Sequence, residues 1–462
     1  MEQTTAKKNK YEIDMCNGTI MDKLISFSLP LMLSGILQLM FNAVDIIVVG
    51  RFSGSQALAA VGSTSALINV FTNLFIGISL GANVLTARFY AAGREKEVSE
   101  TVHTAITLAL VSGIVMALVG LVFSKGALAL MGTPDDVIGL SALYMRIYFL
   151  GMPFFMLYNY GAAILRAVGD TKRPLLFLMI AGVINACLNM VLVIVFKLGV
   201  AGVAIATVIS QMISCVLVLR CLCRSESSYR LCFSELGMKG YYLKQIFSVG
   251  VPAGIQSTVI NFSNVLLQSS VNSFGSTAMA GYTAANNLLG FLYVSVNSIT
   301  QACMSFTSQN YGVGKLKRMD RVLADCMILS VVVAVVLGCI CYGFGPEILQ
   351  IYTEDAEVIA CGMEILAYTT ITYFLCGWMD LFPGALRGMG YSAVPMVLSV
   401  IGTVGTRVVW IFGIFPYHRS LAILFISYPA SWIITIILQV VCFYFVRRRV
   451  HRRSQTPAGQ EG

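Results

Sequence analysis

Residues 29–54 read LPLMLSGILQLMFNAVDIIVVGRFSG, and before Arg51 this run holds a single charged side chain, that of Asp45. A helix crosses the hydrocarbon core of a bilayer with about 20 mostly apolar residues, so the run is long enough to span one. A carboxylate at the centre of such a helix costs about 2.5 to 3.5 kcal/mol on insertion scales. Asp45 is therefore a functional candidate if the rest of the chain also indicates a membrane protein.

The composition of the whole chain indicates a membrane protein. Of its 462 residues, 57% are hydrophobic and 11% are charged, whereas about 25% of a soluble domain is charged. The apolar segments are continuous and do not alternate with polar residues, which excludes a β-barrel. We expect an all-α membrane protein with twelve transmembrane helices in two pseudo-symmetric six-helix lobes. The expected spans are residues 24–49, 57–86, 101–124, 137–160, 175–196, 199–220, 246–272, 278–305, 322–344, 358–382, 393–415 and 420–446.

The positions of the basic residues predict the orientation of the spans. If the N-terminus is cytoplasmic, most of the 31 Lys and Arg residues fall in cytoplasmic segments, as the positive-inside rule requires. Lys7, Lys8 and Lys10 belong to the leader, and Arg447 to Arg449 begin the tail. We expect a multi-pass protein of the cell (cytoplasmic or inner) membrane with both termini in the cytoplasm. This bias explains the net charge of +9, so a nucleic-acid partner is not needed.

The sequence contains an internal repeat. RFYAAGREKE from Arg88 aligns with QNYGVGKLKR from Gln309, and LRAVGDTKRP from Leu165 aligns with LRGMGYSAVP from Leu386, at one common offset. Six spans in each half make the halves parallel repeats, with a substrate cavity expected between them near the bilayer midplane. The expected parts are a cytoplasmic tail (1–23), a first lobe (24–221), a cytoplasmic loop (222–241), a second lobe (242–446) and a basic tail (447–462).

The first half contains a cluster of oxygen-bearing side chains. Ser34, Gln38, Asn42 and Asp45 are spaced at steps of four, four and three, so they share one face of a helix. Pro30, in the same span, lacks the N–H of a regular helix and is expected to bend it. On later spans Asn185 and Asn189 lie four residues apart, and Thr207 offers a hydroxyl and a carbonyl. Such a set can hold a sodium ion, or its acid can load and release a proton; helix–helix hydrogen bonding is the alternative for the amides.

The second half differs from the first in charge. Its equivalent helix carries Gln256 and Asn264 but no acid. Two charges remain within later spans, Asp380 and Arg407, and they are expected to pair across the cavity wall or to contact substrate. Asymmetric charge in a symmetric fold is what we expect if one lobe carries the coupling.

The sequence resembles the multidrug and toxic compound extrusion (MATE) family of secondary transporters, and in particular its DinF-like branch. The resemblance runs from residues 27–54 through the two repeated LR–G segments, LRAVGDTKRP from Leu165 and LRGMGYSAVP from Leu386. The resemblance implies a twelve-helix antiporter that exports organic cations and amphipathic drugs in exchange for protons or sodium. By this resemblance Pro30 matches the bending proline and Asp45 the coupling acid, while Asn185 and Thr207 match further members of the cation site. Asn189 stands where that branch usually has a second Asp, which leaves the choice of ion open.

We therefore predict a cation-coupled antiporter that works by alternating access, with no catalytic residues, no cofactor beyond the coupling ion, no metal site, and a monomeric state. One alternative is a lipid or lipid-linked oligosaccharide flippase of the same superfamily, although few intramembrane Arg or Lys residues favour the drug transporter. An intramembrane enzyme is disfavoured because the three His residues lie far apart in sequence and form no catalytic motif.

Overall fold

The computed structural model describes residues 11–455, and every regular element in that range is a helix. The leader lysines Lys7, Lys8 and Lys10 and the end of the basic tail lie outside the described residues. The elements of the first half are α1 (Met21–Phe52), α2 (Ser55–Ala91), α3 (Glu95–Leu130), α4 (Asp135–Leu150), α5 (Met152–Ala167), α6 (Lys172–Asn189), η1 (Met190–Val195), α7 (Gly199–Cys223) and η2 (Phe233–Glu235). Those of the second half are α8 (Gly240–Asn272), α9 (Ser276–Gly312), α10 (Leu316–Gly343), α11 (Gly345–Gln350), α12 (Ala356–Thr369), α13 (Tyr373–Gly388), α14 (Ala393–Ser399), η3 (Val400–Gly405), α15 (Thr406–Val409), η4 (Trp410–Ile414) and α16 (Leu421–Gln455).

The expected spans correspond to these helices. Within the described residues, eight continuous helices are long and apolar enough to cross a membrane, and two further spans are broken pairs. The pair α4 and α5 bends by 47°, and the pair α12 and α13 bends by 50°. Pro153 lies in the first turn of α5, where its missing N–H is tolerated at a new helix start. The two remaining long helices, α8 and α9, carry more polar residues and account for the other two expected spans.

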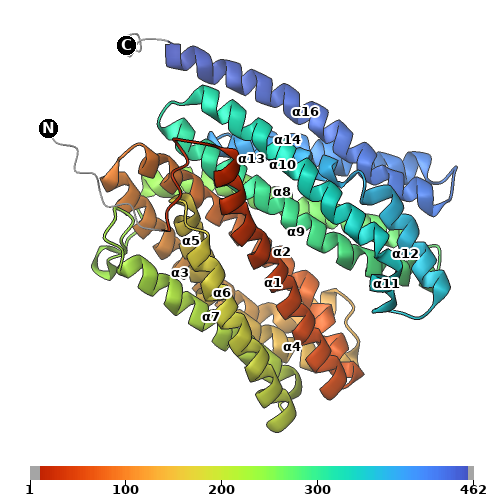
Figure 1. The fold of residues 1–462 in the computed structure, drawn as a ribbon. Helices are drawn as coiled ribbons and strands as arrows, with labels where there is room; N and C mark the ends of the chain where they lie inside the picture. Colours follow the sequence, from red (N-terminus) through yellow and green to blue (C-terminus); the bar gives the residue numbers. More distant parts are fainter. Residues whose placement is uncertain (1–10, 456–462) are drawn as a thin grey trace. The chain divides into compact units, whose positions relative to one another are not determined.

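The chain divides into two compact units, each described by itself. Among the described residues, unit 1 contains 11–13 and 33–254, and unit 2 contains 14–32 and 255–455. In unit 1, α5 packs against α2, α3 and α7; in unit 2, α9 packs against α10, α12 and α13 (Figure 1). The divisions fall inside α1 and α8, two residues after Pro30 and Pro252, whereas the expected lobe boundary lay in the loop at residues 222–241.

Repeated glycines explain why the two halves share their turn sequences. Gly93 and Gly314, which end equivalent helices, have φ of 69° and 72°. Gly169 and Gly390, in the two LR–G motifs, have φ of 99° and 91°. A side chain strains backbone in this left-handed region, so a glycine at these turns is a physical requirement of the fold.

A close crossing of α2 and the first part of α8 organises unit 1. Gly77 on α2 faces Gly254 on α8, while Gly81 lies against the backbone of Ile246 and Gly250 against that of Ile78. The two glycines of each helix have the spacing of a GxxxG motif. A Cβ added to Gly77 would lie 2.3 Å from the Cα of Gly254. Small residues at this spacing let two backbones approach closely, which supplies the packing energy that the hydrophobic effect cannot supply in lipid.

Candidate ion-coupling site

Asp45 lies against the end of α6 in unit 1. The side-chain amide of Asn189 donates from Nδ2 to Oδ1 of Asp45 and, over 3.1 Å, to Oδ1 of Asn185. Asn189 is fully buried and Asn185 is 5% exposed, because both are on the face of α6 that packs inward. Three of the four residues expected at the coupling site are therefore joined by hydrogen bonds.

Thr207 on α7 completes this group. Its side chain lies close enough to the Asp45 carboxyl to interact with it, and its hydroxyl donates to the carbonyl of Val203 over 3.0 Å. Val203 lies one turn earlier on α7. The site thus draws one residue from α1, two from α6 and one from α7.

Two tyrosines that the sequence analysis did not single out also face the site. Tyr144 and Tyr148 on α4 lie close enough to interact electrostatically with Asp45, and their rings stack with centroids 6.1 Å apart. They are four residues apart in sequence, so the helical period alone could have placed them on one face, but nothing in it indicates that this face meets α1.

A break in helix geometry marks the same place. Asn189 is the last α-helical residue of α6, and the π-helix η1 begins at the next residue. π-Helical turns occur frequently at functional sites because the extra residue per turn redirects side chains and frees backbone carbonyls. In the second half, η4 occupies the position equivalent to η1.

The donor set at Asp45 determines what it can bind. The Nδ2 group of Asn189 occupies one carboxylate oxygen, while Oδ1 of Asn189 is buried without a hydrogen-bond partner. A proton on Asp45 needs no further ligand, whereas a sodium ion needs several oxygen ligands beside the carboxylate. No cluster of three or more His, Cys, Asp or Glu side chains suited to a metal occurs within residues 11–455.

Within the described residues, the remaining first-half candidates form no hydrogen bond with Asp45. Gln38 and Asn42 are exposed in the structure, although they share the α1 face with Asp45. Pro30 is buried within α1, which continues as one helix from Met21 to Phe52, and it belongs to unit 2. A bend at Pro30 therefore stays a prediction.

In unit 2 the expected pairing of Asp380 with Arg407 is wrong. Asp380, half-buried on α13, interacts with Arg387 instead, and Arg387 donates from Nη2 to Oε1 of Gln256 over 2.6 Å. Asp380 and Arg387 are seven residues apart, two turns of the same helix, so they share a face. The sequence placed Asp380 and Arg407 on successive spans, but adjacency in the chain does not fix which faces of two helices meet.

Arg407 is held by neutral groups. Its Nη1 donates to Oδ1 of Asn264 over 2.7 Å and to Oγ of Ser263 over 3.2 Å. Its guanidinium carbon lies 4.7 Å from the centroid of the Tyr428 ring. Asn264 is thus a partner of Arg407, as Gln256 is of Arg387.

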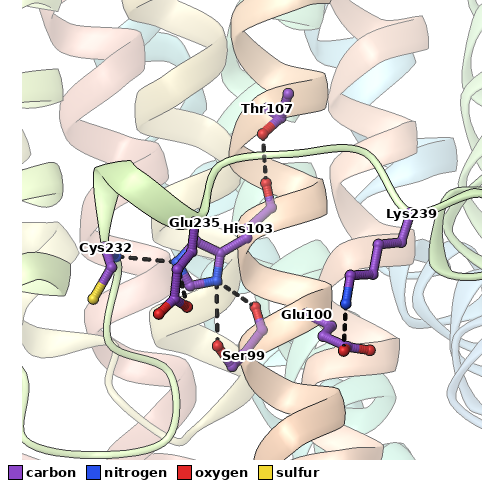
Figure 2. Close-up of polar contacts among 7 residues, drawn as sticks. All are labelled: Ser99, Glu100, His103, Thr107, Cys232, Glu235 and Lys239. Carbon is purple, nitrogen blue, oxygen red and sulfur yellow. Dashed lines mark hydrogen bonds and ion pairs between the residues drawn. The ribbon is translucent and has the colours of Figure 1, made fainter.

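A second polar cluster in unit 1 fastens the loop before α8 to α3. Nδ1 of His103 lies 2.7 Å from the carbonyl oxygen of Ser99, and Nε2 lies 3.0 Å from the backbone nitrogen of Cys232 (Figure 2). The Ser99 carbonyl can only accept, so Nδ1 carries a proton, and the Cys232 N–H can only donate, so Nε2 accepts. An imidazole with one donor and one acceptor nitrogen is neutral. Lys239 forms an ion pair with Glu100 beside it. A cavity of about 400 Å³ adjoins the cluster and is lined by Lys96, Ser99, Glu100, His103, Glu235, Gly237, Met238 and Lys239.

Comparison with known proteins identifies the family. The MatE family model matches the chain twice, over residues 30–191 and over residues 252–412. The chain belongs to the MatE family. The two matches also confirm the internal repeat, because each half fits the same model, and members of this family are transporters.

Relatives and solved structures agree with this assignment. The probable multidrug resistance protein YoeA of Bacillus subtilis (strain 168) is 32% identical over 92% of this chain and 93% of its own length. The multidrug export protein MepA of Staphylococcus aureus (strain NCTC 8325 / PS 47) is 22% identical over 82% of this chain and 84% of its own. A MOP superfamily transporter from Pyrococcus furiosus Vc1 (DSM3638) superposes with a TM-score of 0.88 at 20% identity, covering 98% of this chain and 100% of the other. The all-α MATE fold and the multi-pass membrane class are therefore confirmed.

Proposed function

We propose that this MATE transporter is a cation-coupled antiporter that exports organic cations and other amphipathic drugs by alternating access. The names of YoeA and MepA, which describe drug resistance and drug export, support the substrate class. The Asp45 cluster supports the coupling. We further propose that the protein resides in the cell membrane with both termini in the cytoplasm and acts as a monomer.

The single carboxylate supplies a simple exchange mechanism. Asp45 is the one acid in its cluster, and it can be neutralised by a proton or a sodium ion, or it can attract a cationic substrate. When the outward-open state takes up the ion, the site loses the negative charge that retained the substrate. Release of the ion to the cytoplasm restores that charge, so the ion gradient drives export.

The observation that carries the proposal is the hydrogen bond from Asn189 to Asp45. It favours a proton as the coupling ion, because an amide beside the acid offers one carboxylate where a sodium ion is better held by two. Protonation of Asp45 would also weaken this bond, since the neutral acid is a poorer acceptor than the charged carboxylate. The ion thereby changes the contact between α1 and α6, which a coupled transporter requires.

The test measures uptake of a fluorescent organic cation into inside-out vesicles that are energised by a pH gradient or by a sodium gradient. We expect uptake under the pH gradient, and we expect Asp45→Asn to abolish it. Asp22→Asn is the matched control, because it removes an exposed acid from the first turn of the same helix.

Three results would contradict parts of the proposal. Uptake driven only by sodium would replace the proton by sodium. Uphill transport at the normal rate by Asp45→Asn would remove Asp45 from the coupling mechanism. No uptake by folded wild-type protein under either gradient would favour the flippase, and binding of a lipid-linked oligosaccharide would then support that alternative.

A further inference from the structure

Arg407 is a buried cation without an acidic partner in the described part of the chain. Only 3% of the residue is exposed. The titratable groups that interact with it are the phenols of Tyr282, Tyr373 and Tyr428 and the thiol of Cys376, none of which is a carboxylate. Removing a charge from water is unfavourable unless a countercharge compensates it, and a charged residue within a membrane span is by default a functional candidate.

The hydrogen bonds of the guanidinium within the described residues leave its Nε without a partner. Both bonds within the described residues start from Nη1 and reach Ser263 and Asn264. Nε is buried and has no partner. The Nε–H and Nη2–H groups point in parallel, and this pair of donors is a fork that fits the two oxygens of a carboxylate.

The surroundings of the fork are aromatic and partly accessible. Tyr428 lies under the guanidinium, its hydroxyl is 3.0 Å from that of Tyr282, and its ring packs 5.8 Å from the ring of Trp432. Tyr428 and Asn264 are only half-buried. Aromatic faces beside a charged fork suit an amphipathic molecule better than a bare ion.

The backbone around Arg407 is also irregular. Arg407 lies in α15, a four-residue turn between the π-helices η3 and η4. The polar cluster of unit 1 likewise lies beside a π-helix, η1, which is equivalent to η4 in the repeat. A π-helix thus adjoins a charged group in each unit: η1 follows Asn189, the partner of the Asp45 carboxylate, and η4 follows the turn that carries the Arg407 guanidinium.

From these observations we propose that Arg407 is the centre of a carboxylate-binding site in unit 2. Its Nε–Nη2 fork takes the carboxylate of an amphipathic aromatic acid, whose apolar part lies against the neighbouring aromatic rings. Asn264 and Ser263 hold the guanidinium in place through Nη1. The site does not depend on the proposed function, since an anion can bind here whether or not Asp45 couples transport to an ion.

The experiment uses the purified full-length protein and its own fluorescence. The chain has three tryptophans; Trp410 lies one turn after Arg407, and Trp432 packs on Tyr428. The protein is titrated with 4-phenylbutyrate, with its neutral amide 4-phenylbutyramide, and with acetate. We expect 4-phenylbutyrate to bind at least about tenfold more tightly than the amide, because only the acid forms charge-assisted bonds. We also expect it to bind at least about tenfold more tightly than acetate, which has no apolar part.

Substituted proteins test whether 4-phenylbutyrate binds at the Nε–Nη2 fork of Arg407. Arg407→Gln is expected to remove the preference for the acid over the amide, and Arg407→Lys, which keeps the charge but not the fork, to reduce it. Arg387→Gln is the matched control, because it removes the other arginine of this unit that bonds a side-chain amide. Asn264→Asp gives Arg407 an internal countercharge, so it is expected to abolish binding of the acid even if Arg407→Gln does not fold.

Several results would overturn the proposal. Equal affinity for the acid and the amide would show that charge is not recognised, and equal affinity for acetate would show that no amphipathic ligand is selected. Retention of the preference in folded Arg407→Gln or Asn264→Asp would place the binding elsewhere, as would its loss in Arg387→Gln. Ion-driven uptake in vesicles is measured separately, so a failure of the antiport mechanism is distinguishable from a failure of this site.

Discussion

Asn189 donates a hydrogen bond through its side-chain amide to the carboxylate of Asp45, a residue 144 positions earlier in the chain. The contact joins the fifth expected span to the first. It places an uncharged amide where the DinF-like branch, by resemblance, has a second acid. The proposed coupling site therefore differs from that of the DinF-like branch by one residue, Asn189 in place of Asp. The substitution Asn189→Asp reverses this difference.

Asn189→Asp is expected to increase the dependence of transport on sodium. Two carboxylates in hydrogen-bond contact repel each other when both are ionised, and a sodium ion between them relieves the repulsion. Uptake into inside-out vesicles under a sodium gradient should rise by about tenfold relative to wild type, which corresponds to about 1.4 kcal/mol of added binding energy. Asn159→Asp is the control, because Asn159 bonds a backbone carbonyl on its own helix. Unchanged sodium dependence in Asn189→Asp would contradict the proposed role of position 189.

The His103 contact is expected to control local opening of the loop before α8. Substitution by Leu removes the acceptor of the Cys232 amide, and a hydrogen bond of this kind contributes about 1 kcal/mol. Hydrogen exchange at the Cys232 amide should therefore accelerate about fivefold, because exchange follows the free energy of local opening.

Lys239→Gln provides the comparison for His103→Leu. It breaks the ion pair with Glu100 and leaves the imidazole contact in place. If both variants accelerate exchange at Cys232 equally, the loop opens as a whole and His103 has no separate role.

The helix crossing at Gly77 is expected to tolerate no larger residue. Gly77→Leu would bring a Cβ to 2.3 Å from the backbone of Gly254, and overpacking typically costs about 1 to 3 kcal/mol. The melting temperature of the purified protein should fall by several degrees. Gly62→Leu is the control, since no atom lies within 4 Å of a Cβ at that position of α2. Equal melting temperatures for the two variants would show that the close crossing does not limit stability.

The proposed orientation predicts the location of the C-terminus. Arg447, Arg448 and Arg449 follow the last apolar stretch of α16, and a cluster of arginines at the end of a span favours the cytoplasmic side. A C-terminal green fluorescent protein should be fluorescent, and a C-terminal alkaline phosphatase should be inactive. The reverse pair of results would show that the tail is outside the cell.

Much of the site was predictable because helical spacing is a local property. The four-residue interval from Asn185 to Asn189 places both amides on one face, and the structure confirms that they are joined by a hydrogen bond. The isolated charge of Asp45 in an apolar run is sufficient to identify it as a candidate functional residue. The same reasoning did not find Tyr144 or Tyr148, because aromatic residues at helical spacing occur throughout this chain. It also left Asp380 either to pair with Arg407 or to contact substrate, whereas Asp380 interacts with Arg387 on its own helix.

The sequence by itself determined the membrane class, the duplicated architecture and the residues with unusual chemistry. These properties follow from composition, apolar run length and a repeated motif, which do not depend on how helices pack. Only the tertiary structure decided which side chains meet: Asn189 with Asp45, Arg387 with Gln256, and Arg407 with Ser263 and Asn264. The tertiary structure also decided the π-helical turns and left the buried Nε of Arg407 without a hydrogen-bond partner. They arise from helix rotation and side-chain rotamers, which are set by packing between segments far apart in the chain.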